Sequence, residues 1–239
     1  MGEDGNVSVL SCFRSPALIA LLAVAAFAEA GKVTLKDGVI SYPDGTTGRS
    51  VVQAGGPCSD LWVSPDGEMI AFIRMDKSRP DPAAISPFIE RSTIFVASRS
   101  TGFKPVRVAL YPPRVDGREW NVFRDPVLSP DHRTVYFLVP AAGTSYFLMR
   151  VPVAGGTARP ITWVEAYCVV WGGSRSGDLA ASVRAEPTDE TQGVAHHYYH
   201  YDASGAAKLI GTREHDGDWV DFVRAWAHKY GGTCEANVN

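Results

Sequence analysis

Three histidines in the run His196–His200 are the residues of this sequence that most directly suggest a metal site. On a β-strand, His196 and His200 would share one face roughly 13 Å apart, too far for a single ion, and His197 would point to the other face. On a helix, positions four apart would converge, but the aromatic residues of the run favour a strand. We therefore predict packing or surface histidines and no bound metal.

Other residues that could carry chemistry have unsuitable spacing. Asp216, Asp218 and Asp221 could offer oxygen ligands to calcium, but they do not match an EF-hand loop, which favours a solvated turn. Ser174 lies among glycines, yet its surroundings do not match the G-x-S-x-G pattern of a hydrolase nucleophile. The sequence contains no H-E-x-x-H, P-loop or G-x-G-x-x-G motif. It predicts no catalytic residue and no cofactor, and leaves an enzyme as the less favoured alternative.

Two polar connecting segments are candidate contact surfaces for a partner. Such connections are where binding residues concentrate. The first is Asp76–Pro87, whose prolines predict an exposed loop. The second contains the residues that we predict to bind a partner: Arg114, Asp116, Arg118 and Trp120. Packing of Trp120 beneath its own loop remains an alternative.

Composition indicates a globular, turn-rich protein. Of 239 residues, 45% are hydrophobic and 21% charged, and the net charge is −3. This near balance gives no general electrostatic reason to bind nucleic acid or anionic lipid. Gly (23) and Pro (16) together are about 16% of the chain, above the usual roughly 12%, which favours a β protein with many turns.

Residues 1–30 are predicted to be a signal peptide. The uncharged segment Ala17–Ala28 is shorter than the about 20 residues that span a bilayer, and Arg14 precedes it. Ala28-Glu29-Ala30 is a small-x-small cleavage site, so we expect a mature chain that begins at Gly31 and has no membrane span. A buried helix at the start of the domain is the alternative. Export predicts a periplasmic or secreted protein.

Three cysteines remain after removal of this leader: Cys58, Cys168 and Cys234. An oxidising compartment allows one disulfide and one odd thiol, but the sequence leaves the pairing open. Three small buried side chains are the alternative. Because the sequence contains no C-x-x-C pair, zinc binding has no support.

Three segments of similar pattern indicate internal repeats. Each has an apolar strand, a polar turn and a second apolar strand, and the three align on Ser64, Ser129 and Ser174: Cys58–Ile73, Phe123–Leu138 and Cys168–Val183. In Ser64-Pro65-Asp66-Gly67, proline presets φ for a type I turn and glycine accepts the left-handed conformation that follows. His132 takes the glycine position in the second repeat, and histidine tolerates positive φ better than most residues.

Two further strands follow each hairpin, giving units of four antiparallel strands. Such a unit of about 40 to 45 residues is the blade of a β-propeller. We predict an all-β fold, a small β-propeller of about four four-stranded blades, complete or incomplete, over residues 31–215. Two strands near Val39–Tyr42 and Ser50–Gln53 would form the outer half of a split blade. The closing segment 216–239 would supply its inner half or a short helix over Asp221–Tyr230.

The motif residues resemble a known repeat. Trp62-x-Ser64-Pro65-Asp66-Gly67-x-x-Ile70-Ala71-Phe72, with Gly155–Thr162 closing a later blade, is similar to the repeat of TolB-type propellers. The resemblance implies blades around a channel, export, and binding to other proteins. The third repeat departs from the pattern at Gly172–Gly177.

The expected function is that of an exported, non-catalytic module that binds another envelope or secreted protein. The alternative is a propeller enzyme, or a carbohydrate-binding or ligand-binding module, with its site at the channel mouth. A degenerate remnant of a larger propeller is a third reading. We expect ring closure or self-association, because an isolated open arc would leave blade faces uncovered.

Overall fold

The computed structural model describes residues 33–43, 49–76, 91–109, 114–115, 118–119, 122–141, 145–184, 195–202, 205–214 and 219–235. The predicted signal peptide, Asp116, Trp120, Asp216, Asp218 and the loop after Asp76 lie outside these ranges. None of the described helices has the length and apolar character needed to cross a bilayer.

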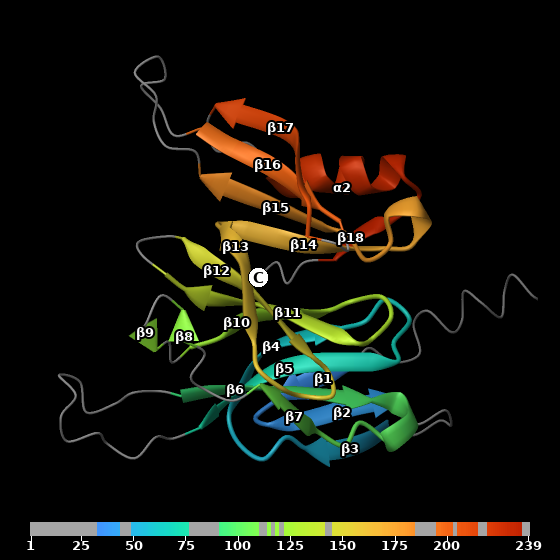
Figure 1. The fold of residues 1–239 in the computed structure, drawn as a ribbon. Helices are drawn as coiled ribbons and strands as arrows, with labels where there is room; N and C mark the ends of the chain where they lie inside the picture. The colour runs from blue at the N-terminus through green and yellow to red at the C-terminus, as the bar shows by residue number, and fades with distance from the viewer. Residues whose placement is uncertain are drawn as a thin grey trace, which may run out of the picture.

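Four antiparallel sheets of three to five strands make up most of the described chain, as the all-β prediction requires (Figure 1). The first sheet contains β1 (Thr34–Lys36), β2 (Val39–Pro43) and β3 (Arg49–Gln53). The second contains β4 (Cys58–Val63), β5 (Met69–Asp76), β6 (Arg91–Ser98) and β7 (Val106–Ala109). The third contains β10 (Arg124–Leu128), β11 (Thr134–Pro140), β12 (Tyr146–Pro152) and β13 (Arg159–Val164). In each, consecutive strands are neighbours.

The fourth sheet is a meander with an added strand. It contains β14 (Ala166–Trp171), β15 (Leu179–Arg184), β16 (Ala195–Tyr201), β17 (Ala207–Glu214) and, beside β14, β18 (Thr233–Glu235). The helix α2 (Trp219–Lys229) precedes β18, which confirms the predicted C-terminal helix. Short 3₁₀ turns η1 (Arg99–Thr101) and η2 (Gly173–Arg175), and a small hairpin of β8 (Arg114–Val115) and β9 (Arg118–Glu119), complete the described elements.

The Ser-Pro-Asp turns form as predicted in the first two repeats. Ser64 Oγ donates to Asp66 Oδ1 and accepts from the Met69 N–H at 2.9 Å. Ser129 and Asp131 repeat these contacts, with the Thr134 N–H donating at 3.0 Å. Gly67 has φ 70° and His132 has φ 57°, so both occupy the left-handed position. The side chains thus satisfy the backbone donors that a tight turn leaves open.

The alignment of the third repeat on Ser174 is wrong. The Val170 N–H donates to the Asp178 carbonyl at 2.9 Å, the bond that Ser64 and Ser129 make in their hairpins. Val170 is therefore the equivalent residue, and Ser174 lies in η2 within a longer turn. A Cβ at Gly173 would lie 2.1 Å from the Tyr230 carbonyl oxygen, so the turn is shaped to admit the C-terminal segment.

The expected split blade is also wrong. Within the described residues, the C-terminal strand β18 pairs with β14 and not with the first sheet, and β1 supplies the third strand of that sheet. A disulfide joins Cys168 of β14 to Cys234 of β18. Cys58 lies outside this bridge, and its thiol donates to the Gly56 carbonyl at 3.3 Å. Among the described residues, no strand from the C-terminal part of the chain therefore joins the first sheet.

Apolar clusters hold neighbouring sheets together. One cluster contains Ile40 from the first sheet and Phe72 from the second. A larger one joins the second, third and fourth sheets through residues such as Trp62, Phe137 and Val169. On the outer face of the fourth sheet, α2 takes the place of a further blade and packs Val223 against Cys168 and Ala180. Figure 1 shows the helix lying beside this sheet.

The turn serines give a matched test of the corrected alignment. We expect Ser129→Ala to lower the free energy of unfolding by about 1 kcal/mol, because the turn loses two hydrogen bonds of Ser129 Oγ. Ser174→Ala should change it by less than about 0.5 kcal/mol, since Ser174 is exposed. Urea unfolding of both variants measures this. Equal losses would contradict the revised register.

The disulfide predicts a redox-dependent stability. Cys168→Ser should lower the free energy of unfolding of the oxidised protein by about 2–4 kcal/mol, because the bridge closes a loop of 66 residues. Cys58→Ser should change it little, and reductant should abolish the difference between wild type and Cys168→Ser. A loss that persists in reductant would show that Cys168 acts through packing alone. Non-reducing peptide mapping identifies the pairing directly.

Candidate binding site at the inner strands

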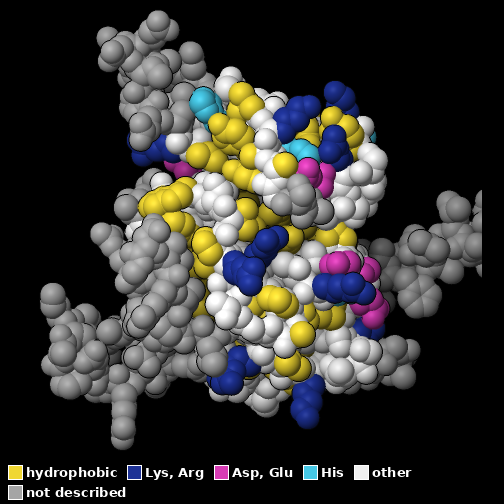
Figure 2. All heavy atoms as spheres, viewed as in Figure 1, with side chains coloured by type: hydrophobic (Ala, Val, Ile, Leu, Met, Phe, Trp, Pro, Cys, Tyr) yellow, Lys and Arg dark blue, Asp and Glu magenta, His cyan; other side chains and the backbone are white. Residues whose placement is uncertain are grey.

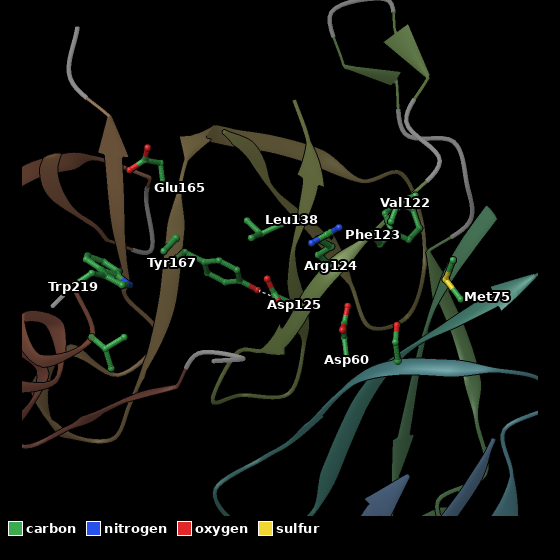
Figure 3. Close-up of a pocket in the computed structure, with 13 residues that line it drawn as sticks. Asp60, Met75, Val122, Phe123, Arg124, Asp125, Leu138, Glu165, Tyr167 and Trp219 are labelled. Atoms are coloured by element: carbon green, nitrogen blue, oxygen red, sulfur yellow. Dashed lines mark hydrogen bonds between the residues drawn. The ribbon is translucent and has the colours of Figure 1, made fainter. Parts of the chain in front are cut away.

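A cavity of about 630 Å³ lies where the inner strands of three sheets begin (Figure 3). Ser59 and Asp60 come from β4, Arg124 and Asp125 from β10, and Tyr167 from β14. Trp219 at the start of α2 completes the wall on the side of the fourth sheet. The lining combines aromatic, aliphatic and charged side chains, as ligand-binding and protein-binding pockets do.

Asp60 and Asp125 occupy equivalent positions at β-bulges. The register with the neighbouring strand shifts between Ser59 and Trp62 in β4 and between Arg124 and Val127 in β10. Asp60 has φ 51° and Asp125 has φ 50°, a left-handed backbone that costs free energy in residues other than glycine. Bulges re-aim side chains at the rims of sheets. In Figure 3, Asp60 points from β4 toward β10.

The two carboxyl groups have raised pKa values. Burial raises the pKa of Asp125 to about 6, and the charge of Asp60 adds to the effect, while Arg124 opposes it. Burial also raises the pKa of Asp60, against a hydrogen bond from the Asp125 N–H and the charge of Arg124. Asp125 is thus poised to exchange a proton near neutral pH, a property that concentrates at functional sites.

Tyr167 fixes the backbone of β10 from the fourth sheet. Its hydroxyl donates to the Asp125 carbonyl, drawn as a dashed line in Figure 3. Burial, with the charge of Asp125, raises the pKa of Tyr167 well above its ordinary value, so the phenol stays protonated and able to donate. This bond connects the inner strands of two sheets across the cavity.

The histidines of the predicted strand each have partners. His196 Nδ1 lies 2.6 Å from Glu165 Oε2 at the cavity edge, and His200 Nε2 lies 2.6 Å from Asp178 Oδ2 in the interior. His197 contacts the ring of Tyr199. Across the described ranges, no group of three potential ligands is placed to hold a metal ion.

Of the predicted partner-binding residues, the structure describes two. Arg114 and Arg118 lie on the β8–β9 hairpin, where Arg114 pairs with Glu119 and Val115 with Arg118. Asp116 and Trp120 lie outside the described residues. The hairpin precedes Val122 and Phe123, which line the cavity, and Figure 3 shows it rising at that rim.

Sequence reasoning missed Asp60 and Asp125 as site residues. Each aspartate stands four residues before the turn serine of its repeat, Ser64 or Ser129. An acidic residue that recurs at the start of an otherwise apolar inner strand could have identified these two positions. No sequence pattern indicates the bulge that turns their side chains toward one cavity.

Within the described residues, these sheets, repeated as antiparallel meanders around three inner strands, define a β-propeller-type fold with one short helix near the C-terminus. No family model and no curated protein sequence matches the chain.

Three solved structures are similar to it at low identity. The β-propeller domain of the Trilobed protease from Pyrococcus furiosus is 13% identical with a TM-score of 0.46, over 77% of this chain and 58% of that one. The tricorn protease is 10% identical with a TM-score of 0.44, over 74% and 21%. A TolB candidate from Agrobacterium tumefaciens is 14% identical with a TM-score of 0.39, over 74% and 62%. The chain thus matches less than two thirds of each.

The raised pKa of Asp125 predicts the direction of a pH effect. Between about pH 4 and 6 the folded state holds a proton that the unfolded state has lost, so the free energy of unfolding falls as pH rises. Asp125→Asn should therefore be more stable than wild type at pH 7, by about 1 kcal/mol after solvent screening, and equal to it below pH 4.

Asp131→Asn provides a control, because it should lower the free energy of unfolding at pH 7, where Asp125→Asn should raise it. The hydrogen bond from Ser129 lowers the pKa of Asp131, so this carboxylate stabilises the fold above its ordinary pKa and loses that effect as pH falls. Urea unfolding at about pH 3, 5 and 7 measures both variants. Destabilisation by Asp125→Asn at pH 7 would contradict the assignment.

Proposed function

We propose that this chain is an exported, non-catalytic β-propeller module that binds another envelope or secreted protein through the cavity end of its inner strands. The observation that carries the proposal is the cavity of about 630 Å³ built from three sheets and α2. It joins separate blades at one rim, so a partner seated there would contact several elements at once. Self-association is a form of the same proposal, with a second copy as the partner.

The chain's connections support this choice of surface. Cys58 pairs with Arg74, Arg124 with Leu138, and Ala166 with Ser182, so the starts of β4, β10 and β14 lie at the same end as the ends of β5, β11 and β15. The end of β5 at Asp76 and the start of β6 at Arg91 therefore lie at the cavity end, and Figure 3 shows the β8–β9 hairpin near the same cavity. Connections carried by a rigid scaffold are favoured places for binding.

Surface composition favours a protein partner over nucleic acid. Figure 2 shows apolar side chains interspersed with separate small groups of Lys and Arg and of Asp and Glu on one face. A nucleic-acid surface would gather positive charge into a continuous patch. The Cys168–Cys234 disulfide supports export, since such bridges persist in oxidising compartments.

A ligand-binding or catalytic role at the same cavity is the second candidate. The pKa of Asp125, raised to about 6, and the left-handed backbone of Asp60 and Asp125 favour it. A small cationic or hydroxylated ligand would suit two carboxyl groups beside Arg124 and Tyr167. This role predicts that the protein binds a small molecule and that Asp60→Asn removes this binding. The leading proposal predicts that the protein binds its partner without a small molecule.

Blocking the cavity rim tests the proposal. Ser59→Arg places a long cation at the exposed start of β4, and Ser100→Arg places one in η1 at the opposite end of the same sheet. With the full chain as bait in extracts of exported proteins, wild type and Ser100→Arg should recover the same partner. Ser59→Arg should bind that purified partner at least about tenfold more weakly, because a large residue occupies the contact. Equal affinities would contradict the proposed surface.

A further inference from the structure

Two arginines face each other on the outer strands of the third sheet. Arg150 of β12 pairs in register with Arg159 of β13, and on its other side with Tyr136 of β11. Residues paired across antiparallel strands project from the same face, so both guanidinium groups lie on one face of the sheet. Like charges directly opposite each other are destabilising, so the repulsion between Arg150 and Arg159 lowers the stability of this sheet.

The surrounding carboxylates do not neutralise the pair. Within the described ranges, neither arginine forms an ion pair with an acidic residue. Asp131 and Asp178 act electrostatically on the neighbouring Tyr136. However, Asp131 accepts hydrogen bonds from Ser129 and the Arg133 N–H, and Asp178 is engaged by His200 and Arg175. Both arginines are exposed, so solvent surrounds much of their positive charge.

Both arginines line a cavity of about 450 Å³ at the turn end of the third sheet, away from the site described above. Thr134 and Thr157 add two hydroxyl groups to its wall, and the rest comes from Val151 and Pro152. Guanidinium groups offer planar forks of N–H donors that match oxyanions, and threonine hydroxyls can donate to the same oxygens. The wall is therefore rich in donors and positive charge.

The arginine pair is particular to this blade. A bulge between the third and fourth strands recurs in the three meanders, after Ile94, Leu148 and Tyr198. Counted from that bulge, the positions of Arg150 and Arg159 are held by Val96 and Val106 in the second sheet and by His200 and Lys208 in the fourth. Since the fold tolerates an apolar pair there, blade architecture does not require two arginines.

We propose that this cavity binds a dianionic oxyanion of the phosphate type, with Arg150 and Arg159 as its principal donors. A dianion balances both of the charges that repel each other, whereas a monoanion such as a carboxylate balances only one. A phosphate monoester carries about −1.5 to −2 charge at neutral pH and three strong acceptor oxygens. Charge-assisted bonds from paired guanidinium groups are the strong class of hydrogen bond.

Calorimetric titration of the full chain with inorganic phosphate tests the proposal. At constant ionic strength, and at an alkaline pH at which inorganic phosphate is mainly the dianion, wild type should bind phosphate and bind acetate more weakly. Arg150→Gln and Arg159→Gln should each weaken phosphate binding by about tenfold or more. The matched control is Arg107→Gln, an exposed arginine of β7 whose neighbour across the strands is Phe95, and it should bind as wild type does.

A charge reversal separates binding from folding. Arg159→Glu places a carboxylate opposite Arg150, so it should raise the midpoint of thermal unfolding without phosphate and remove the further rise that phosphate gives wild type. Phosphate binding that is absent in wild type, or equal in Arg107→Gln and Arg159→Gln, would overturn the proposal. Titration with O-phosphoserine assigns the source: binding as tight as that of inorganic phosphate indicates a phosphate monoester, and weaker binding indicates the free ion.

Discussion

The need to cover sheets that are apolar on both faces determines this architecture. Phe72 and Ile73, adjacent in β5, are both fully buried, one toward the first sheet and the other toward the third. Such a sheet is stable only between two neighbours, because each exposed apolar face costs about 25 cal/mol per Å². Stacking therefore continues until an element with one polar side ends it. At the C-terminal end that element is α2, with Val223 buried and Arg224 exposed.

The same stacking creates the cavity. Inner strands from three sheets converge, and the contact of Tyr167 with the Asp125 carbonyl holds two of them at a fixed spacing. Where β4 and β10 begin, bulges interrupt the regular pairing. A space lined by Asp60 and Asp125 follows from the geometry of the fold, and burial then raises the pKa of both groups.

Sequence patterns predicted most of the fold because its signals are local. The Ser-Pro-Asp turns, the strand alternation and the helix over Asp221–Tyr230 depend on neighbouring residues. The wrong alignment of Ser174 and the wrong split blade arose where distant segments decide. The backbone of Tyr230 lies so close to residue 173 that only glycine fits there, and β18 pairs with β14 across a long sequence separation. For the same reason, Asp60 and Asp125 were visible as repeat residues but not as neighbours in one site.

Hydrogen exchange measured by mass spectrometry tests the central claim, that α2 covers the fourth sheet in place of a further blade. Val223→Asp puts a charge into the contact with Cys168 and Ala180, whereas Arg224→Asp changes an exposed residue of the same helix. The account predicts faster exchange in β14–β16 for Val223→Asp, with β4–β7 unchanged and Arg224→Asp like wild type. Unchanged exchange in β14–β16 for Val223→Asp would contradict it.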